Sequence, residues 1–155
     1  MGSINRIAIL SNVNLEILNQ DLLKKYHVFK QDGYGQWIQY AIDDKKISSF
    51  NPDIIFLILD GFALLEGVTD NSDIELELHN IFAYIERLAL SHASIPVYVS
   101  NIDIPPRRII EGDSLRPEHI TMNMWENKLR EHILNNKNLH IFHLRTMIEN
   151  VGRNN

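Results

Sequence analysis

The segment Ile54-Ile55-Phe56-Leu57-Ile58-Leu59 is the clearest indication of fold in this sequence of 155 residues. Six consecutive apolar residues lie between Pro52-Asp53 and Asp60-Gly61, a pattern typical of a strand buried on both faces. Such strands occur in parallel sheets, because the crossover connections place helices over the sheet. We therefore predict that residues 54–59 form the central strand of a parallel α/β sheet.

Shorter apolar runs on either side of this segment predict four more strands. They cover residues 7–10, 27–30, 96–99 and 139–142, and the weaker pattern of 27–30 suggests a place near an edge. Helical periodicity predicts intervening helices from Asn12 or Asn14 to about 25, in part of 37–47, and over 74–91, 120–134 and 146–151. The alternation predicts a three-layer α/β/α sandwich around a five-stranded parallel sheet, with a flavodoxin-like or SGNH-hydrolase-like arrangement.

Composition narrows the class of protein. The chain is 45% hydrophobic and 23% charged, which is an ordinary globular mixture, and we expect residues 1–155 to form a single α/β domain. A net charge of −5 argues against a protein that tracks nucleic-acid phosphates. The absence of cysteine excludes disulfides and thiolate chemistry. Apolar runs are too short for a membrane span or a signal peptide, so we expect a cytoplasmic protein.

Polar residues follow the predicted strands at the points where each strand ends. They are Ser11-Asn12, residues 32–36, Asp60-Gly61 and Ser100-Asn101. In open parallel sheets, ligands bind beyond the carboxyl ends of the strands. We expect these four corners to share one edge of the sheet and to form any functional site.

Ser11 is the candidate nucleophile at this edge. A serine hydroxyl needs a neighbouring imidazole to take its proton, and His143, at the end of the last predicted strand, is the best-placed base, followed by His119. Oxyanion or ligand-binding contacts would come from Asn12, Gly35, Asp60 and Asn101. The alternative is that Ser11 and Asn12 simply cap a helix. No histidine pair has metal-binding spacing, so we predict neither a metal nor a cofactor.

The string Gly112-Asp113-Ser114-Leu115 spells a motif that names a hydrolase family. In that family the serine ends the first strand, whereas here the string falls in the long loop after the fourth predicted strand. This position does not present the serine at a strand-to-helix corner. We interpret the match as coincidence.

The corners together resemble the N-terminal domain of FkbH-type proteins. The resemblance runs from Arg6 to Arg153 and rests on the order and spacing of its parts. These are Ile7 to Asn12, Gly33 to Gln36, Pro52-Asp53 leading to Leu59-Asp60, Asn101 with Pro105-Pro106 and Gly112, the helix around 123–134, and the final segment with Gly152.

The resemblance implies an SGNH-hydrolase-like fold. In the family, this domain precedes a haloacid-dehalogenase-type domain that transfers a glyceryl group to an acyl-carrier protein, in polyketide or in capsule and surface-polysaccharide pathways. It therefore implies an acyl-carrier protein, or a separate haloacid-dehalogenase-type domain, as partner. On the family's pattern Ser11 occupies the nucleophile corner, Gly35 lies near the second block, and Asp60 stands where active hydrolases carry Gly-x-Asn-Asp.

The sequence departs from this pattern where catalysis depends on it. Ile9-Leu10, and not Gly-Asp, precede Ser11, and Asp60-Gly61-Phe62 lacks the oxyanion asparagine. Neither the Asp-x-x-His block nor the dehalogenase signature Asp-x-Asp-x-Thr can be read. The leading hypothesis is an accessory binding domain without complete catalytic apparatus. The alternatives are a divergent esterase or acyl transferase that uses Ser11, and a structural domain whose surface serves oligomerisation.

Overall fold

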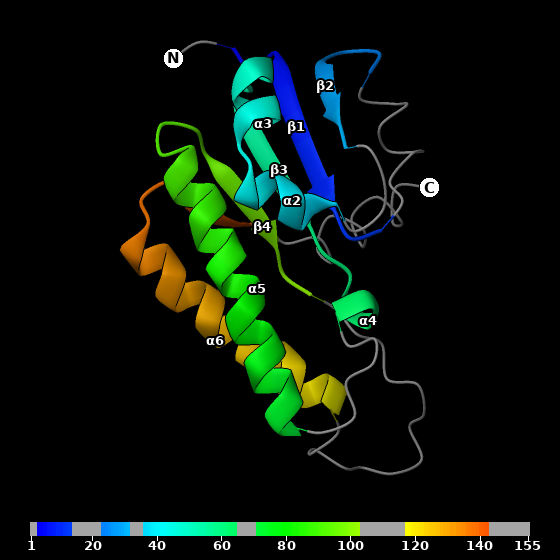
Figure 1. Cartoon of the computed structure of the whole chain (residues 1–155), viewed down its shortest axis with the longest axis vertical. Helices are drawn as coiled ribbons and strands as arrows, with labels where there is room; N and C mark the ends of the chain where they lie inside the picture. Colours follow the sequence, from blue (N-terminus) through cyan, green and yellow to red (C-terminus); the bar gives the residue numbers. More distant parts are fainter. Residues whose placement is uncertain (1–2, 14–22, 32–35, 65–70, 103–116, 143–155) are drawn as a thin grey trace, which may run out of the picture.

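A computed structural model describes residues 3–13, 23–31, 36–64, 71–102 and 117–142 of the chain (Figure 1). Its sheet has five strands: β1 (Arg6–Ser11), β2 (His27–Lys30), β3 (Ile54–Ile58), β4 (Val97–Ser100) and β5 (Leu139–Phe142). Their order is β2-β1-β3-β4-β5, and every neighbouring pair is parallel. The predicted five-stranded parallel α/β fold is confirmed, with β3 in the centre and β2 at an edge.

Five helices are described between and after these strands: α2 (Trp37–Ile42), α3 (Lys45–Phe50), α4 (Gly61–Leu64), α5 (Asn71–Ser91) and α6 (Pro117–Asn135). The segment predicted as partly helical, 37–47, is two helices separated at Asp43-Asp44. Residues 23–25 form a turn, while the rest of the helix predicted after Asn12 and the one over 146–151 lie outside the described residues. Among the described helices, none is long and apolar enough to cross a membrane.

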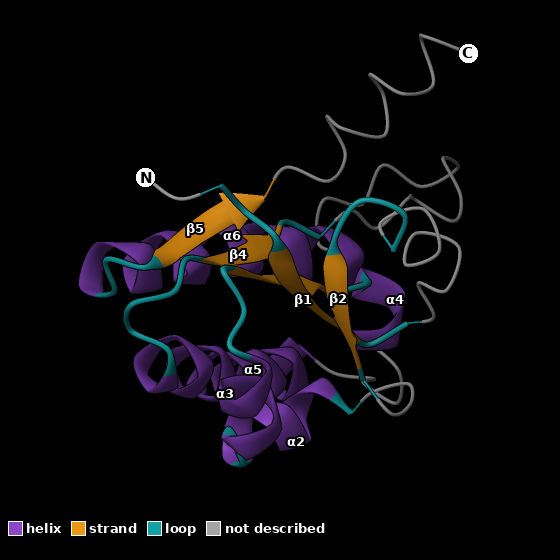
Figure 2. Cartoon of the chain, turned by 90° about the horizontal axis from the view of Figure 1, so that it is seen from above, coloured by secondary structure: helices purple, strands orange, loops and turns teal. Residues whose placement is uncertain are grey.

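One face of the sheet carries the main core. Alternate residues of the strands point into it, such as Ala8 and Leu10 of β1 and Val97 and Val99 of β4. Helices α2, α3 and α5 lie together on one side of the sheet (Figure 2), and α6 adds Trp125 to the same buried cluster. The period of two along each strand therefore decides which side chains meet the helices.

The opposite face has a smaller core with the other half of the strand residues. Ile7, Ile9, Ile54 and Ile58 are buried there. Partly buried aromatic rings extend this cluster across the sheet: Phe56 lies 5.7 Å from Tyr98 and 5.6 Å from Phe142 between ring centroids. Both faces of the central strands are apolar, which explains why their sequences show continuous apolar runs.

Asp53 links the amino end of β3 to the amino end of β1 by hydrogen bonds. Its Oδ2 accepts hydrogen bonds from the backbone N–H groups of Asn5 (2.8 Å) and Arg6 (2.9 Å). These bonds hold the pKa of the Asp53 carboxyl below its ordinary value of 3.8, with a smaller contribution from the charge of Arg6. Just upstream, Asn51 ends α3 in a left-handed conformation (φ 54°), and its N–H bonds to the carbonyl of Ile47.

Candidate functional site

The carboxyl edge of the sheet brings together four of the six residues predicted for the site. Ser11 ends β1 and Asn12 follows it, while Asp60 lies just beyond β3 and Asn101 just beyond β4. Gly35 and His143 lie outside the described residues. With this strand order, the direction of winding reverses between β1 and β3, and ligands of such folds bind in the crevice at that point.

The side chain of Asn12 spans the gap between β1 and β3. Its Nδ2 donates to the carbonyl oxygen of Asp60 at 3.0 Å, and its Oδ1 accepts from the N–H of Asp60 at 2.8 Å. The side-chain amide therefore takes the place of a backbone amide and extends the hydrogen-bond ladder between β1 and β3 by one step. Both polar atoms of Asn12 are engaged by the backbone of Asp60.

Gln31 makes the same kind of bridge on the other side of β1. Its Oε1 accepts from the N–H of Ser11 at 3.0 Å, and its Nε2 donates to the carbonyl of Ser11 at 2.8 Å. Gln31 lies just outside the four corners predicted from the sequence. The signal that identifies it is the one used for the others, a polar residue directly after a strand, here β2.

Ser100 joins β4 to the central strand in a third bridge. Its fully buried Oγ accepts from the N–H of Leu59 at 2.9 Å. The indole Nε1 of Trp125 donates to the carbonyl of Ser100 at 3.2 Å, which ties α6 to the same point. Side chains therefore link the carboxyl ends of β2, β1, β3 and β4 in sequence.

Ser11 itself is buried, with 2% of its surface exposed. Its Oγ accepts a hydrogen bond from the N–H of Val13 at 3.1 Å, a local side-chain bond of the kind that shapes turns and helix starts. Within the part of the chain that the structure describes, no histidine contacts this hydroxyl. His143 lies outside that part, and so does the side chain of His119 in α6.

Asp60 and Asn101 complete the edge through their backbones. The carbonyl of Asp60 accepts from Leu64 N–H at 3.2 Å, at the start of the short helix α4, and Asn101 N–H donates to the carbonyl of Phe142 at 3.0 Å. Both residues are half-buried. Across the described ranges, no cluster of three or more His, Asp or Glu side chains is arranged to hold a metal ion.

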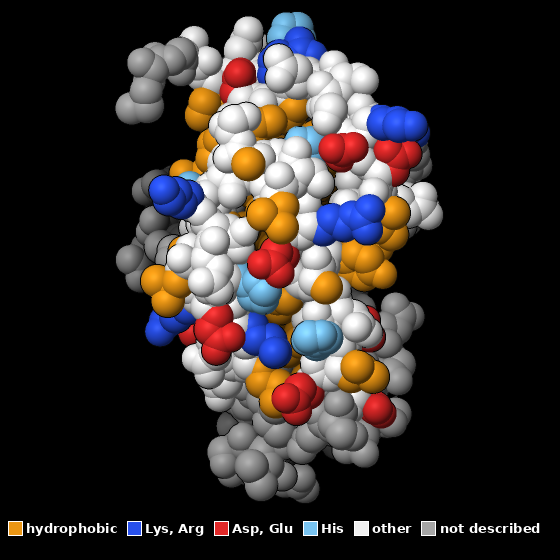
Figure 3. All heavy atoms as spheres, turned by 60° about the vertical axis from the view of Figure 1, so that its left-hand side comes forward, with side chains coloured by type: hydrophobic (Ala, Val, Ile, Leu, Met, Phe, Trp, Pro, Cys, Tyr) orange, Lys and Arg blue, Asp and Glu red, His pale blue; other side chains and the backbone are white. Residues whose placement is uncertain are grey.

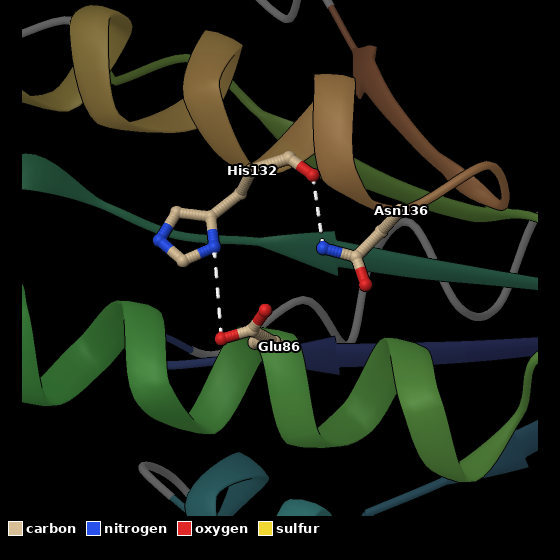
Figure 4. Close-up of polar contacts among 3 residues, drawn as sticks. All are labelled: Glu86, His132 and Asn136. Atoms are coloured by element: carbon tan, nitrogen blue, oxygen red, sulfur yellow. Dashed lines mark hydrogen bonds and ion pairs between the residues drawn. The ribbon is translucent and has the colours of Figure 1, made fainter.

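His132 is an example of a histidine with a packing role. Its ring stacks on Phe82 of α5, with centroids 5.1 Å apart and planes at 9°, and its Nδ1 lies 3.9 Å from Oε2 of Glu86 (Figure 4). Asn136 donates from Nδ2 to the carbonyl of His132 at 2.9 Å. This imidazole therefore belongs to the contact between α5 and α6.

The geometry defines an α/β sandwich domain whose carboxyl edge is joined by side-chain bridges. No protein-family model matches the chain, and no curated protein matches it. It is similar to a crystal structure of the N-terminal part of the protein BF1531 from Bacteroides fragilis, which contains a phosphatase domain and is complexed with Mg. The TM-score is 0.73 at 15% identity over 97% of this chain, so the likeness supports the three-layer fold. The chain spans 43% of the length of that structure.

Proposed function

We propose that this chain is an accessory binding domain of FkbH-type biosynthetic machinery and lacks a complete catalytic apparatus. The observation that carries the proposal is that Ser11 and Asn12 make hydrogen bonds to the backbone at the carboxyl edge. The Ser11 hydroxyl is buried and accepts from Val13, and the Asn12 amide is bound on both sides by Asp60. A nucleophile and an oxyanion donor need groups directed at substrate, whereas these groups are directed at backbone.

The proposed setting is a larger assembly. The similar crystal structure contains a phosphatase domain, and this chain spans less than half of its length. Together with the resemblance to FkbH-type proteins, this supports a partner of the haloacid-dehalogenase type, or an acyl-carrier protein whose acyl group rests at the carboxyl edge. Polyketide or surface-polysaccharide biosynthesis is the proposed pathway class, with the cytoplasm as the site of action.

Turnover of p-nitrophenyl acetate tests whether catalysis is missing. We expect the chain to release nitrophenol no faster than its Ser11→Ala variant does. Ser48→Ala, at an exposed position of α3, is the matched control for loss of a serine hydroxyl. Turnover that disappears in Ser11→Ala and persists in Ser48→Ala would contradict the proposal.

Binding is tested by amide chemical shifts of the isotope-labelled chain. We expect phosphopantetheinylated acyl-carrier protein, or a haloacid-dehalogenase-type domain added separately, to shift the amide signals of Asn12, Asp60 and Asn101. Shifts confined to the other end of the strands would place the contact elsewhere. If neither protein shifts any signal, the binding proposal fails.

A divergent esterase or acyl transferase is the second candidate function. It is favoured by the position of Ser11, which ends β1 at the reversal of winding, next to the strand that leads to Asp60. In this hypothesis Ser11 is the nucleophile and His143 the base. The same assay decides between the two functions, because only this one predicts turnover that depends on Ser11.

A further inference from the structure

Large apolar side chains that remain exposed gather on the helical layer over the main core. Six such side chains occur in the part of the chain that the structure describes, and four belong to this layer: Ile42 at the end of α2, Leu76 and Leu90 of α5, and Leu134 of α6. Leu76 and Leu90 are 61% and 65% exposed. Single exposed leucines are common on protein surfaces, so the feature to explain is the arrangement of these two on one helix.

Leu76 and Leu90 form a stripe together with Ala83, which is also exposed. The three residues are spaced by seven, so each lies above the last with a turn of only about 20°. The stripe is about 21 Å long, because a helix rises by about 1.5 Å per residue. A surface helix ordinarily has a polar outer side, whereas α5 has this outer stripe in addition to the inner one that carries Leu78 and Ile85 into the main core.

Charged side chains flank the outer stripe, and their signs differ between its two halves. The half of α5 after Ala83 carries Glu86 and Arg87. The half before Ala83 carries three exposed carboxylates: Asp73, Glu75 and Glu77. On the face over α5 and α6, apolar side chains lie among side chains of both charges (Figure 3). An apolar centre with a charged rim is the usual anatomy of an interface between proteins.

Arg87 is held in place beside the outer stripe. Its Nη2 donates to the carbonyl of Ile42 at 3.0 Å, which joins α5 to the end of α2. A guanidinium has several N–H donors, and those that Ile42 does not use can bind a carboxylate. A cation fixed in this way loses little further freedom when an anion binds.

We propose that α5 pairs with α5 of a second copy of this chain, antiparallel and across a two-fold axis at Ala83. In this arrangement Leu76 of each copy packs against Leu90 of the other. Ala83 meets its own copy at the axis, where a small side chain lets the two helices approach closely. The outer stripe is therefore complementary to itself, which is the requirement of a two-fold interface.

Charge favours the antiparallel orientation. It places the half with three carboxylates against the half of the other copy that carries Arg87, and it opposes the two helix dipoles. Beside the stripe, Glu86 of each copy lies at nearly the same height as His79 of the other. A parallel pair would instead gather the carboxylates of both copies at one end, and like charges across an interface are unfavourable.

The size of the contact sets the expected strength of this dimer. A standard stable interface buries about 800 Å² on each partner. About four turns of one helix from each copy, with an alanine at the centre, bury less than that. We therefore expect a dimer that dissociates in the micromolar range, with a Kd of about 1–100 µM.

Sedimentation equilibrium of the full chain tests the proposal. We expect the mass to rise from that of one chain toward that of two as the concentration increases from about 1 to 500 µM. Ala83→Glu places two carboxylates at the axis and should weaken the Kd by about tenfold or more. Leu134→Glu adds the same charge at an exposed position of α6 outside the stripe and should leave the Kd unchanged.

Two results would overturn the proposal. One is a chain that stays monomeric throughout this range of concentration, and the other is an equal effect of the two substitutions on the Kd. Circular dichroism confirms that each variant is folded, so that a loss of dimer reports on the interface.

Disulfide crosslinking tests the orientation, because the chain contains no cysteine of its own. On oxidation by dissolved oxygen, Ala83→Cys should form a linked dimer, since its two sulfurs meet at the axis. Leu76→Cys mixed with Leu90→Cys should form a mixed dimer, whereas the two copies of Leu76→Cys alone lie about 21 Å apart and should not link. Linking of Leu76→Cys alone that is faster than linking of the mixture would show a parallel pair and overturn the antiparallel arrangement.

The dimer is independent of the proposed function at the carboxyl edge. Ala83 lies in α5, outside that edge, so Ala83→Glu should leave unchanged the amide shifts of Asn12 and Asp60 on addition of a carrier protein or a dehalogenase-type domain. Dimer formation can therefore fail while binding at the edge succeeds, and the reverse also holds.

Discussion

At the scale of single residues, Asn12 is the most direct link between two strands, because its side-chain amide joins the end of β1 to the backbone after β3 by two hydrogen bonds. Asn12→Ala removes both bonds to Asp60 and leaves its half-buried N–H without this acceptor, while its carbonyl keeps the bond from Leu64 N–H. We expect the free energy of unfolding to fall by about 1–3 kcal/mol. Urea denaturation followed by circular dichroism measures the change.

The control for this substitution is Asn123→Ala, at an exposed position of α6. Alanine favours the helix, so the free energy of unfolding should change by no more than about 0.5 kcal/mol or rise slightly. Equal effects of the two substitutions would mean that the Asn12 bridge does not stabilise the sheet.

His92 predicts a dependence of stability on pH. The side chain is 5% exposed, its Nε2 is buried without a hydrogen-bond partner, and burial lowers its pKa below the ordinary 6.5, opposed more weakly by the charge of Asp44. Below about pH 6.5 the unfolded chain binds a proton that the folded chain does not. The contribution to stability is therefore present above pH 6.5 and lost as the pH falls through the lowered pKa.

Denaturation by urea at several pH values tests this prediction. His92→Leu, which replaces the imidazole with an apolar group, should reduce the loss of stability between about pH 7 and pH 5. His79→Leu, at an exposed position of α5, controls for removal of an imidazole. A pH profile that is unchanged in His92→Leu would refute the assignment.

At the scale of elements, α6 is held by a few apolar side chains that enter the main core. Leu129 is 1% exposed in the main core, whereas Leu134 of the same helix is 87% exposed. Leu129→Ala should lower the free energy of unfolding by about 2–5 kcal/mol, since it leaves a cavity. Leu134→Ala should change it by no more than about 0.5 kcal/mol, and a similar cost for both would show that α6 does not pack as described.

The sequence predicts the strands correctly, because they are buried on both faces of the sheet. It does not predict where short helices begin and end, because local hydrogen bonds determine those positions. Short apolar runs identified all five strands, most clearly the continuous runs of β1 and β3, because both faces of the sheet are apolar there. The break between α2 and α3 was missed, although Asp43-Asp44 interrupts the pattern and Asp43 accepts from the N–H of Lys45. The single turn of α4 was also missed, because four residues are too few to show a period.

For the site, the sequence predicts the positions of the residues but not their hydrogen-bond partners. Strand ends placed Ser11, Asn12, Asp60 and Asn101 at one edge from sequence alone, because parallel strands end together. The partners of their polar atoms were not predictable from sequence. Asn12 bonds to a residue 48 positions away and Ser11 to one 20 positions away, and only the register of the sheet fixes those contacts.

At the scale of the whole molecule, the parallel sheet separates two kinds of surface. Side-chain bridges join the strands at the carboxyl edge, and five cations line two hollows at the amino end: Arg6, Lys24, Lys25, Lys45 and Lys46. The net charge of −5 does not predict this group of cations. Its members come from three separate stretches of the sequence. Folding gathers them at the ends of β1 and β2 and along α3.

The central claim is that polar side chains at the carboxyl edge hold the strands together through hydrogen bonds to the backbone. Amide hydrogen exchange tests it most directly, at the N–H groups of Ser11, Leu59 and Asp60, whose acceptors are side chains. We expect these amides to exchange as slowly as those in the middle of β3, and Asp60 alone to exchange fast in Asn12→Ala. Exchange of these amides at the rate of an exposed loop, in the unmodified chain, would contradict it.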